Sequence, residues 1–87
     1  MKMEYEIIFS PRARKDFKKI DRETKTKVKE ALKGILAVPP KGDIKKLKGF
    51  QGRFRLRVGY WRILYSLDRK IGELIVLEIL PRKDAYK

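Results

Sequence analysis

Arginines alternate with apolar residues along residues 53–58, and this segment carries the strongest indication of chemistry in the sequence. The alternation predicts a strand whose polar face presents Arg53, Arg55 and Arg57. Gly59 and Tyr60 suit a two-residue hairpin turn, which places Arg57 opposite Arg62 on the returning strand. Like charges directly opposed across a sheet destabilise it by up to about 1 kcal/mol per pair, so stability alone does not favour this arrangement. The hairpin is therefore a candidate anion-binding site.

A second hairpin is predicted to bring another arginine to the same edge. Residues 74–80 read as an apolar strand that returns antiparallel beside residues 61–67, and Arg82 follows it closely. Tyr86 comes four residues later. Guanidinium groups pair bidentately with phosphate oxygens and neutralise charge that grows on them, whereas a phenol stacks on a base or transfers a proton. The group suits the binding of a phosphodiester.

The remaining basic and aromatic residues near these hairpins have two interpretations each. Residues 41–52 form a basic loop whose lysines either contact phosphates or are simply solvated, and these are Lys45, Lys46 and Lys48. The Arg-rich strand face is in the same way either a binding surface or a solvated face. The aromatic residues of the hairpin are expected in the core or at its rim, in preference to stacking on bases, and these are Tyr60, Trp61 and Tyr65.

Missing residue types narrow the chemistry further. The chain contains neither histidine nor cysteine, so disulfides, thiolate metal sites and a histidine base are excluded. It also lacks a phosphate-cradling glycine loop and a metal-binding motif. We therefore expect no metal and no small-molecule cofactor, and any catalysis must use Arg, Lys, Tyr, Asp or Glu.

The charge balance indicates the class of partner. Lys and Arg number 24 against 11 Asp and Glu, which gives a formal net charge of +13. Such a field attracts polyanions, with nucleic acid as the first expectation and an acidic protein as the second. No apolar stretch reaches the roughly 18 residues of a membrane span, and no signal peptide opens the sequence, so a cytoplasmic location is expected.

The elements that position these residues are predicted from periodicity and capping signals. The length of 87 residues suits a single domain over residues 1–87. Ser10 and Asp21 are predicted to cap two helices, and Pro39-Pro40 ends the second. The expected order is a strand over residues 3–9, the two helices to about residue 38, the basic loop, and strands over residues 53–58, 61–67 and 74–80. The predicted fold is α+β, in the order β-α-α-β-β-β, with a helical hairpin packed on one face of an antiparallel sheet.

With these motifs the chain resembles the RelE/ParE superfamily of toxins, and the resemblance covers nearly its whole length. It is carried by Ser10-Pro11-Arg12-Ala13, by residues 46–49, by the run over residues 54–65 and by the closing residues 81–86. The run over residues 54–65 is the most specific part, because the helices alone match many folds.

The resemblance implies an activity and roles for individual residues. RelE-type members cleave messenger RNA in the ribosomal A site through attack of a 2′-hydroxyl on the adjacent phosphate, without a metal. By this resemblance Arg57, Arg62, Arg82 and Tyr86 are the catalytic residues, and Arg55 is a further basic residue of the first hairpin. The residues expected to bind RNA are Arg53, Arg55, Lys45, Lys46 and Lys48. Pro81 stands where many relatives have a histidine, and arginine is a poor proton acceptor, so the group that takes up the 2′-hydroxyl proton is left open.

The expected partners are the ribosome with its messenger and an acidic, RelB-like antitoxin with an amphipathic helix or an extended segment. Two other functions stay open from the sequence. The first is a ParE-like inhibitor of DNA gyrase, which acts by binding a protein. The second is a basic RNA- or ribosome-binding module that performs no chemistry.

Overall fold

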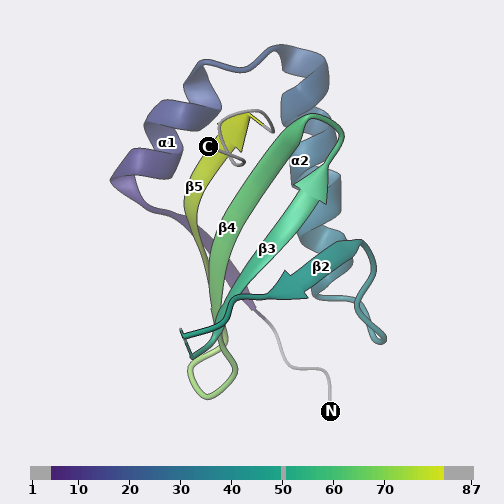
Figure 1. Ribbon diagram of the computed structural model, residues 1–87, viewed down its shortest axis with the longest axis vertical. Helices are drawn as coiled ribbons and strands as arrows, with labels where there is room; N and C mark the ends of the chain where they lie inside the picture. The colour runs from purple at the N-terminus through teal and green to yellow at the C-terminus, as the bar shows by residue number, and fades with distance from the viewer. Residues whose placement is uncertain (1–4, 50, 82–87) are drawn as a thin grey trace.

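A computed structural model describes residues 5–49 and 51–81 of the chain. Five strands form one sheet in the order β1-β5-β4-β3-β2. In Figure 1 the two helices lie behind and beside the strands, so the face of the sheet turned to the viewer carries no helix. The elements are β1 (Glu6–Phe9), α1 (Pro11–Lys18), α2 (Arg22–Ile35), β2 (Asp43–Lys46), β3 (Arg53–Val58), β4 (Trp61–Asp68) and β5 (Glu73–Pro81). The predicted α+β class, with a helix pair on one face of the sheet, is confirmed.

The core lies between the helices and the inner face of the three central strands. Leu56, Ile63 and Ile79 are register partners across β3, β4 and β5, and all three are buried. The helices cover them with Ala13, Val28, Leu32 and Ile35. Because side chains alternate along a strand, the residues between these apolar positions face away from the helices. This places the arginines of β3 on the helix-free face.

Both predicted helix starts are confirmed. The Ser10 side chain accepts a hydrogen bond from the Ala13 amide at 3.0 Å, and Pro11 occupies the first turn of α1. Asp21 caps α2 by accepting from the Thr24 amide, and hydrogen bonding to Thr24 lowers the pKa of this carboxyl. The second helix ends at Ile35, earlier than residue 38, because its last turn tightens into bonds between residues three apart before the prolines.

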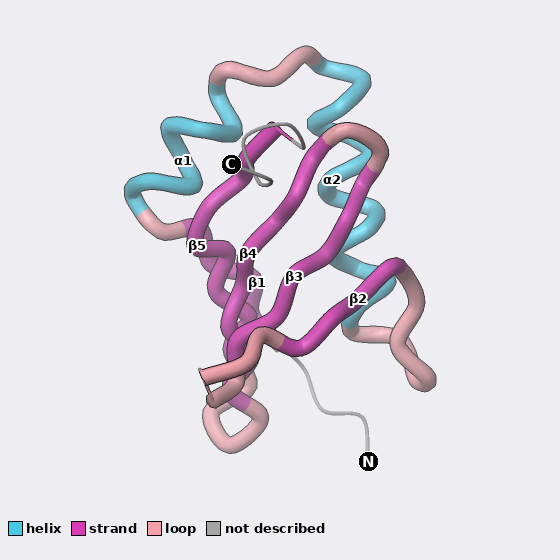
Figure 2. Tube along the Cα trace, in the orientation of Figure 1, coloured by secondary structure: helices cyan, strands magenta, loops and turns pink. Residues whose placement is uncertain are grey.

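Strand β2 lies within residues 41–52, which the sequence predicts to be a loop. Ile44 is partly buried against the core, and the strand pairs antiparallel with β3 from Asp43↔Arg57 to Lys46↔Phe54. Four residues with three charged side chains give too weak an alternation to identify a strand. The order is therefore β-α-α-β-β-β-β, and β2 forms one edge of the sheet (Figure 2).

The pairing of β1 is also different from the expected antiparallel sheet. It runs parallel to β5, from Glu6↔Glu73 to Phe9↔Val76. The two helices carry the chain from one edge of the sheet to the other, so the first strand lies beside the last and has the same direction. β1 begins at Glu6 rather than residue 3, and residues 3 and 4 lie outside the described part of the chain.

Helix α1 takes over the edge of β5 where β1 ends. The Ser10 hydroxyl donates to the Leu77 carbonyl at 2.9 Å, and the Ile79 amide donates to the Asp16 carboxylate at 3.1 Å. The register between β4 and β5 is irregular at Leu64/Tyr65, next to this contact. Two side chains thus satisfy backbone groups of β5 that a neighbouring strand would otherwise bind.

None of the described helices is long and apolar enough to cross a membrane.

Candidate nucleic-acid interface

The hairpin of β3 and β4 has the register that the sequence predicts. Val58 pairs with Trp61 and Arg57 pairs with Arg62, so two arginines lie directly opposite each other on the helix-free face. Gly59 turns the chain with a φ of +57°, which glycine adopts without strain. Because the turn has only two residues, it sets the register of the hairpin and so places Arg57 opposite Arg62.

The four arginines of this hairpin differ in exposure. Arg53 is exposed, Arg57 and Arg62 are half-buried, and Arg55 is buried with 6% of its surface exposed. Arg55 has Lys45 as its cross-strand partner on β2 and Leu64 on β4, which places it in the middle of the sheet. We define the arginine face as these four residues: Arg53, Arg55, Arg57 and Arg62.

A carboxylate lies within the arginine face. Asp43 Oδ1 is 3.4 Å from Arg55 Nη2, and Asp43 Oδ2 is 3.9 Å from Arg57 Nη1. Its side chain is 56% exposed, whereas that of Arg55 is 7% exposed. The sequence offers no direct signal for this residue, because Asp43 lies in a segment predicted to be a loop. It becomes recognisable only when β2 pairs with β3.

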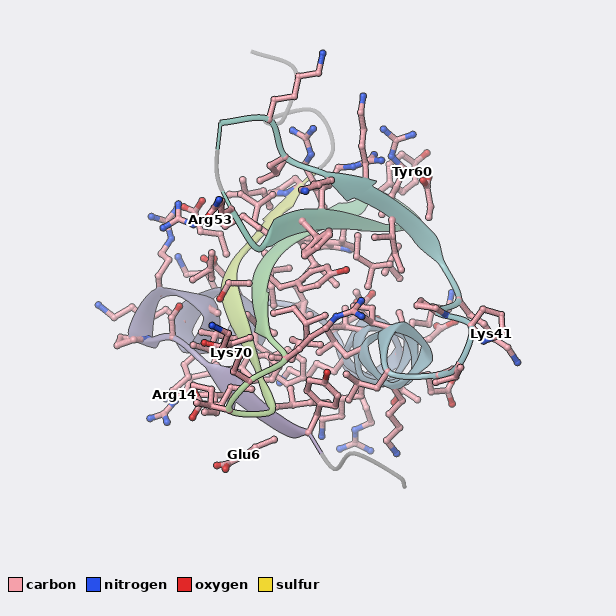
Figure 3. All side chains as sticks on the ribbon, turned by 90° about the horizontal axis from the view of Figure 1, so that it is seen from below. Glu6, Arg14, Lys41, Arg53, Tyr60 and Lys70 are labelled. Carbon is pink, nitrogen blue, oxygen red and sulfur yellow. The ribbon has the colours of Figure 1, made fainter. Side chains whose placement is uncertain are left out.

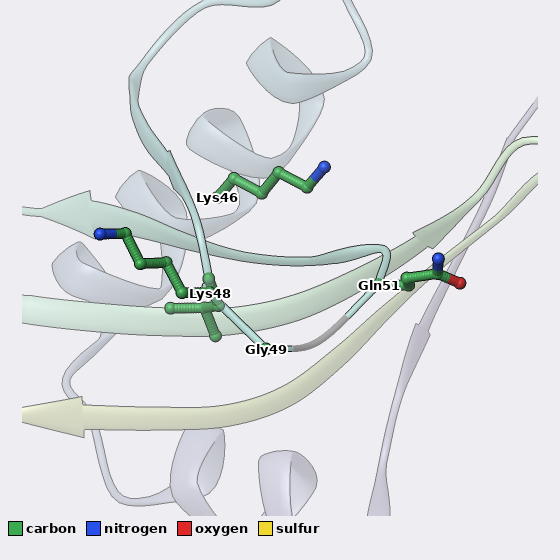
Figure 4. A pocket seen from close by; sticks show the side chains of 5 residues that line it. Lys46, Lys48, Gly49 and Gln51 are labelled. Atoms are coloured by element: carbon green, nitrogen blue, oxygen red, sulfur yellow. The ribbon is translucent and has the colours of Figure 1, made fainter.

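The predicted RNA-binding lysines are exposed and lie at the β2 edge. Lys45 shares the helix-free face with Arg55, whereas Lys46 is opposite Phe54 and therefore belongs to the other face. Lys48 lies in the loop between β2 and β3. Lys46 and Lys48 line a hollow of about 540 Å³, and in Figure 4 their side chains extend in opposite directions. The three lysines thus do not form one cluster.

The aromatic residues of the hairpin divide between the core and the surface. Tyr65 is 1% exposed, and its ring stacks on that of Phe54 with the ring centroids 5.4 Å apart. Burial raises the pKa of the Tyr65 phenol to about 12. Trp61 is half-buried and packs against the core, as expected. Tyr60 is 80% exposed at the tip of the hairpin (Figure 3), which contradicts the expected place in the core or at its rim. Its position at the turn between β3 and β4 leaves its ring without a core to join.

The second predicted hairpin brings the end of β5 to the same edge. Pro81 pairs with Trp61 and Leu80 pairs with Arg62, so the chain leaves β5 beside the facing arginines. Arg82 and Tyr86, two of the four predicted catalytic residues, lie outside the described residues. On the same strand Glu78 lies 3.6 Å from Arg12 and acts as a charge partner.

The described residues gather cationic side chains on the helix-free face of the sheet. Among residues 5–49 and 51–81, no group of three potential metal ligands comes together. Nitrogen-tipped side chains surround the molecule in Figure 3, in agreement with the net charge of +13. The arginine face differs from this general positive charge in one respect. Arg57 on β3 and Arg62 on β4 are register partners, so two cationic side chains start directly opposite each other.

Solved structures with a similar fold include RelE-type toxins and their complexes with antitoxins. The RelB–RelE antitoxin–toxin complex from Methanococcus jannaschii superposes with a TM-score of 0.73 at 27% identity and covers 91% of this chain and 94% of that one. The RelBE2 toxin–antitoxin complex from Mycobacterium tuberculosis gives 0.73 at 29% identity, with 91% and 99% covered. A mutant of the E. coli toxin RelE in the free state gives 0.79 at 20% identity, with 97% and 90% covered, and supports the fold alone.

Sequence comparison defines the family. Residues 7–86 match the model for the ParE toxin of the type II toxin–antitoxin system parDE. A protein of Methanocaldococcus jannaschii with the provisional name toxin RelE1 is 32% identical over 88 residues, which covers 98% of each chain. The chain belongs to the ParE toxin family, within the RelE/ParE superfamily, and is a toxin of a toxin–antitoxin system of this type.

Proposed function

We propose that this toxin is a metal-independent endoribonuclease that cuts messenger RNA in the ribosomal A site and so stops translation. The observation that carries the proposal is the register of Arg57 opposite Arg62 on a face that no helix covers. A phosphodiester placed between two guanidinium groups binds through charge-assisted hydrogen bonds and relieves the repulsion between them. Relatives of this chain carry the name RelE, and the resemblance to the RelE type implies this activity.

The proposed reaction is an internal transesterification. The 2′-oxygen of one nucleotide attacks the adjacent phosphorus, the bond from phosphorus to the 5′-oxygen breaks, and the products are a 2′,3′-cyclic phosphate and a 5′-hydroxyl. Negative charge grows on the non-bridging oxygens during the attack, and Arg57 and Arg62 neutralise it. By resemblance to the RelE type, Arg82 adds a third guanidinium and Tyr86 orients the nucleotide. The 2′-hydroxyl gives up its proton and the leaving 5′-oxygen takes one up, and the arginines provide neither the acceptor nor the donor for these two transfers.

Contacts along the RNA backbone complete the proposed interface. Arg53, Lys45 and Lys48 are exposed around the β2 edge and supply positive charge for phosphates on either side of the cut, and Lys46 adds charge from the other face of the same edge strand. Arg55, which is buried, supports this surface from within the sheet. Dependence on the ribosome follows, because the ribosome positions the messenger and supplies what the arginines lack in proton transfer. Residues 1–87 are proposed to act as one domain, in the cytoplasm, where the ribosomes are.

The partner that controls the toxin is proposed to be an acidic, RelB-like antitoxin. Two of the structural relatives were solved as complexes of this kind. Its acidic residues would meet the basic surface, while apolar residues bury against the toxin, because exposed charge pairs contribute only about 0–1 kcal/mol each.

Inhibition of DNA gyrase is the second candidate, and the family match to ParE favours it. A gyrase inhibitor acts by contact with a protein and has no need for facing arginines on an open face. A basic ribosome-binding module without chemistry is the third possibility, and it predicts arrest with an intact messenger.

One experiment separates the three. Purified protein is incubated with ribosomes programmed with a short messenger, and the cut ends are mapped and tested for a 5′-hydroxyl. We expect cuts in the A-site codon, little cleavage of the same messenger without ribosomes, and unchanged gyrase supercoiling activity. Intact messenger together with inhibited gyrase would establish the second function, and intact messenger with stalled ribosomes would establish the third.

A further inference from the structure

Asp43 binds two arginines of the arginine face at once. One carboxylate oxygen lies 3.4 Å from Arg55 Nη2 and the other lies 3.9 Å from Arg57 Nη1. Asp43 is the register partner of Arg57 across β2 and β3, so the carboxylate meets Arg57 directly and Arg55 diagonally. The aspartate therefore connects the buried arginine to the arginine that faces Arg62.

Arg55 needs this carboxylate more than an exposed arginine does. Its side chain is 7% exposed, and a buried guanidinium is costly unless a counter-charge compensates it. Within the described part of the chain, Nε of Arg55 is buried without a hydrogen-bond partner. The contact with Arg55 therefore restrains the Asp43 carboxylate, whose other oxygen lies beside the guanidinium of Arg57.

A carboxylate on this face opposes the binding of RNA, because it repels phosphate. Asp43 compensates the charge of the buried Arg55, and its second carboxylate oxygen gives it a further effect on the geometry of the facing arginines. We propose that Asp43 is a positioning residue of the proposed ribonuclease, which holds the Arg57 guanidinium opposite Arg62 in the orientation that receives the scissile phosphate. The inference rests on the proposed function, and it assigns to Asp43 a contribution to the rate of cleavage that is separate from RNA binding.

The start of β2 is built so that Asp43 reaches this position. Gly42 has a φ of +123°, and a Cβ atom there would lie 2.9 Å from Leu56 Cδ1 in the packed core. Glycine thus lets the chain turn closely over Leu56 into the strand. Ile44 then packs inward, and alternation directs Asp43 to the arginine face. Asp43 occupies the first residue of β2, where the turn and the inward isoleucine hold it.

The test compares three variants in two assays. Asp43→Asn removes the charge but keeps the shape, Asp43→Glu keeps the charge, and Glu23→Gln adds the same net charge on α2, where Glu23 contacts only Lys27 among the ion pairs of the described residues. Cleavage is measured in single turnovers on programmed ribosomes. Affinity is measured separately with a single-stranded RNA that carries a 2′-deoxy nucleotide at the cut position and is not cleaved, and thermal unfolding is recorded for every variant.

For Asp43→Asn we expect RNA affinity to be equal or higher and the cleavage rate to fall about tenfold to a hundredfold, as small misplacements of catalytic groups do. Asp43→Glu should restore most of the rate, and Glu23→Gln should cleave like the wild type. An unchanged rate in Asp43→Asn overturns the inference, as does a joint loss of rate, affinity and melting temperature, which identifies a structural role. If the wild type itself cuts no messenger, the proposed function is overturned and the inference with it. A wild type that cuts while Asp43→Asn cuts equally well overturns the inference alone.

Discussion

At the residue scale, Arg62 is expected to matter for anion binding because it lies opposite Arg57. The two-residue turn sets the register that places the backbone positions of Arg57 and Arg62 opposite each other, so both side chains start from the same point of the face. An anion between them removes like-charge repulsion and gains charge-assisted hydrogen bonds at the same time. The free energy of anion binding should therefore depend more on these two side chains than on an equally exposed arginine elsewhere.

We expect Arg62→Ala to lower cleavage of ribosome-bound messenger by about a hundredfold or more, as the loss of one transition-state donor does. The substitution relieves the repulsion with Arg57 but also removes the other interactions of Arg62, so the free energy of unfolding should change by no more than about 1 kcal/mol. Arg69→Ala in the exposed loop after β4 is the matched control and should keep full activity. A loss of activity that follows the melting temperature would contradict a role in catalysis.

Tyr60 offers an exposed ring next to the facing arginines. Single-stranded RNA binds where aromatic rings accept stacked bases beside a positive surface. We expect Tyr60→Ala to weaken binding of single-stranded RNA by about 1–3 kcal/mol, and Tyr60→Phe to keep it. Fluorescence of the adjacent Trp61 provides the binding signal. Ile71→Ala, at a residue 65% exposed on another loop, should leave affinity unchanged. Equal losses in both alanine variants would exclude stacking.

Tyr65 should make the fold sensitive to alkaline pH. Its pKa rises from 10.0 to about 12 on folding, so the unfolded chain releases the phenol proton at lower pH than the folded chain. The stabilisation is complete below the lower value and is lost as pH rises toward the higher one, by up to about 2–3 kcal/mol. Denaturant titrations should therefore show that Tyr65→Phe loses less stability over this interval than the wild type. Parallel curves for the two proteins would contradict the raised pKa.

At the scale of the elements, the Ser10 side chain both caps α1 and links the start of this helix to β5. Its hydroxyl caps the helix through the Ala13 amide and also donates to the Leu77 carbonyl of β5. We expect Ser10→Ala to lower the free energy of unfolding by about 1–3 kcal/mol, because a cap and a partly buried hydrogen bond are lost together. Thr26→Ala on the exposed side of α2 is the control, and it should be neutral or slightly stabilising. Equal effects in chemical denaturation would show that neither the cap nor the link to β5 contributes measurably.

The helices and the arginine hairpin could be predicted because their signals are local. Ser10 and Asp21 are capping residues next to periodic segments, and Gly59-Tyr60 fixes the register of its own hairpin. β2 could not be predicted, because its four residues become a strand only through pairing with β3. The parallel pairing of β1 with β5 was also beyond local signals, since it joins residues at opposite ends of the described chain. Asp43 and the burial of Arg55 depend on these pairings and were missed with them.

At the scale of the whole molecule, a net charge of +13 governs encounters with partners. Opposite fields accelerate association with an acidic antitoxin, and salt screens this effect. Once the complex has formed, its lifetime depends on buried apolar contacts, which salt does not weaken. Association and dissociation should therefore respond differently to ionic strength.

We expect the product of the adjacent open reading frame to co-purify with this toxin at high salt. Its association rate should fall steeply as salt is added, whereas its dissociation rate should change little. Surface plasmon resonance over a series of salt concentrations measures both rates. A basic protein of similar net charge and unrelated fold, measured against the same partner, is the control for non-specific electrostatic attraction. A complex that dissociates as the salt is raised would show that it lacks an apolar anchor.

The pairing of the first strand with the last has a consequence for the order in which the protein is made. β1 leaves the ribosome first, yet its partner β5 is among the last segments to be synthesised, and the Ser10–Leu77 bond joins residues 67 positions apart. A nascent chain that stops before β5 lacks Leu74, Val76 and Ile79 from the core. Such long-range contacts also make folding slow compared with local hairpin formation. The arginine hairpin is thus synthesised before the core that supports it is complete, and incomplete chains carry the charges of the toxin without its fixed geometry.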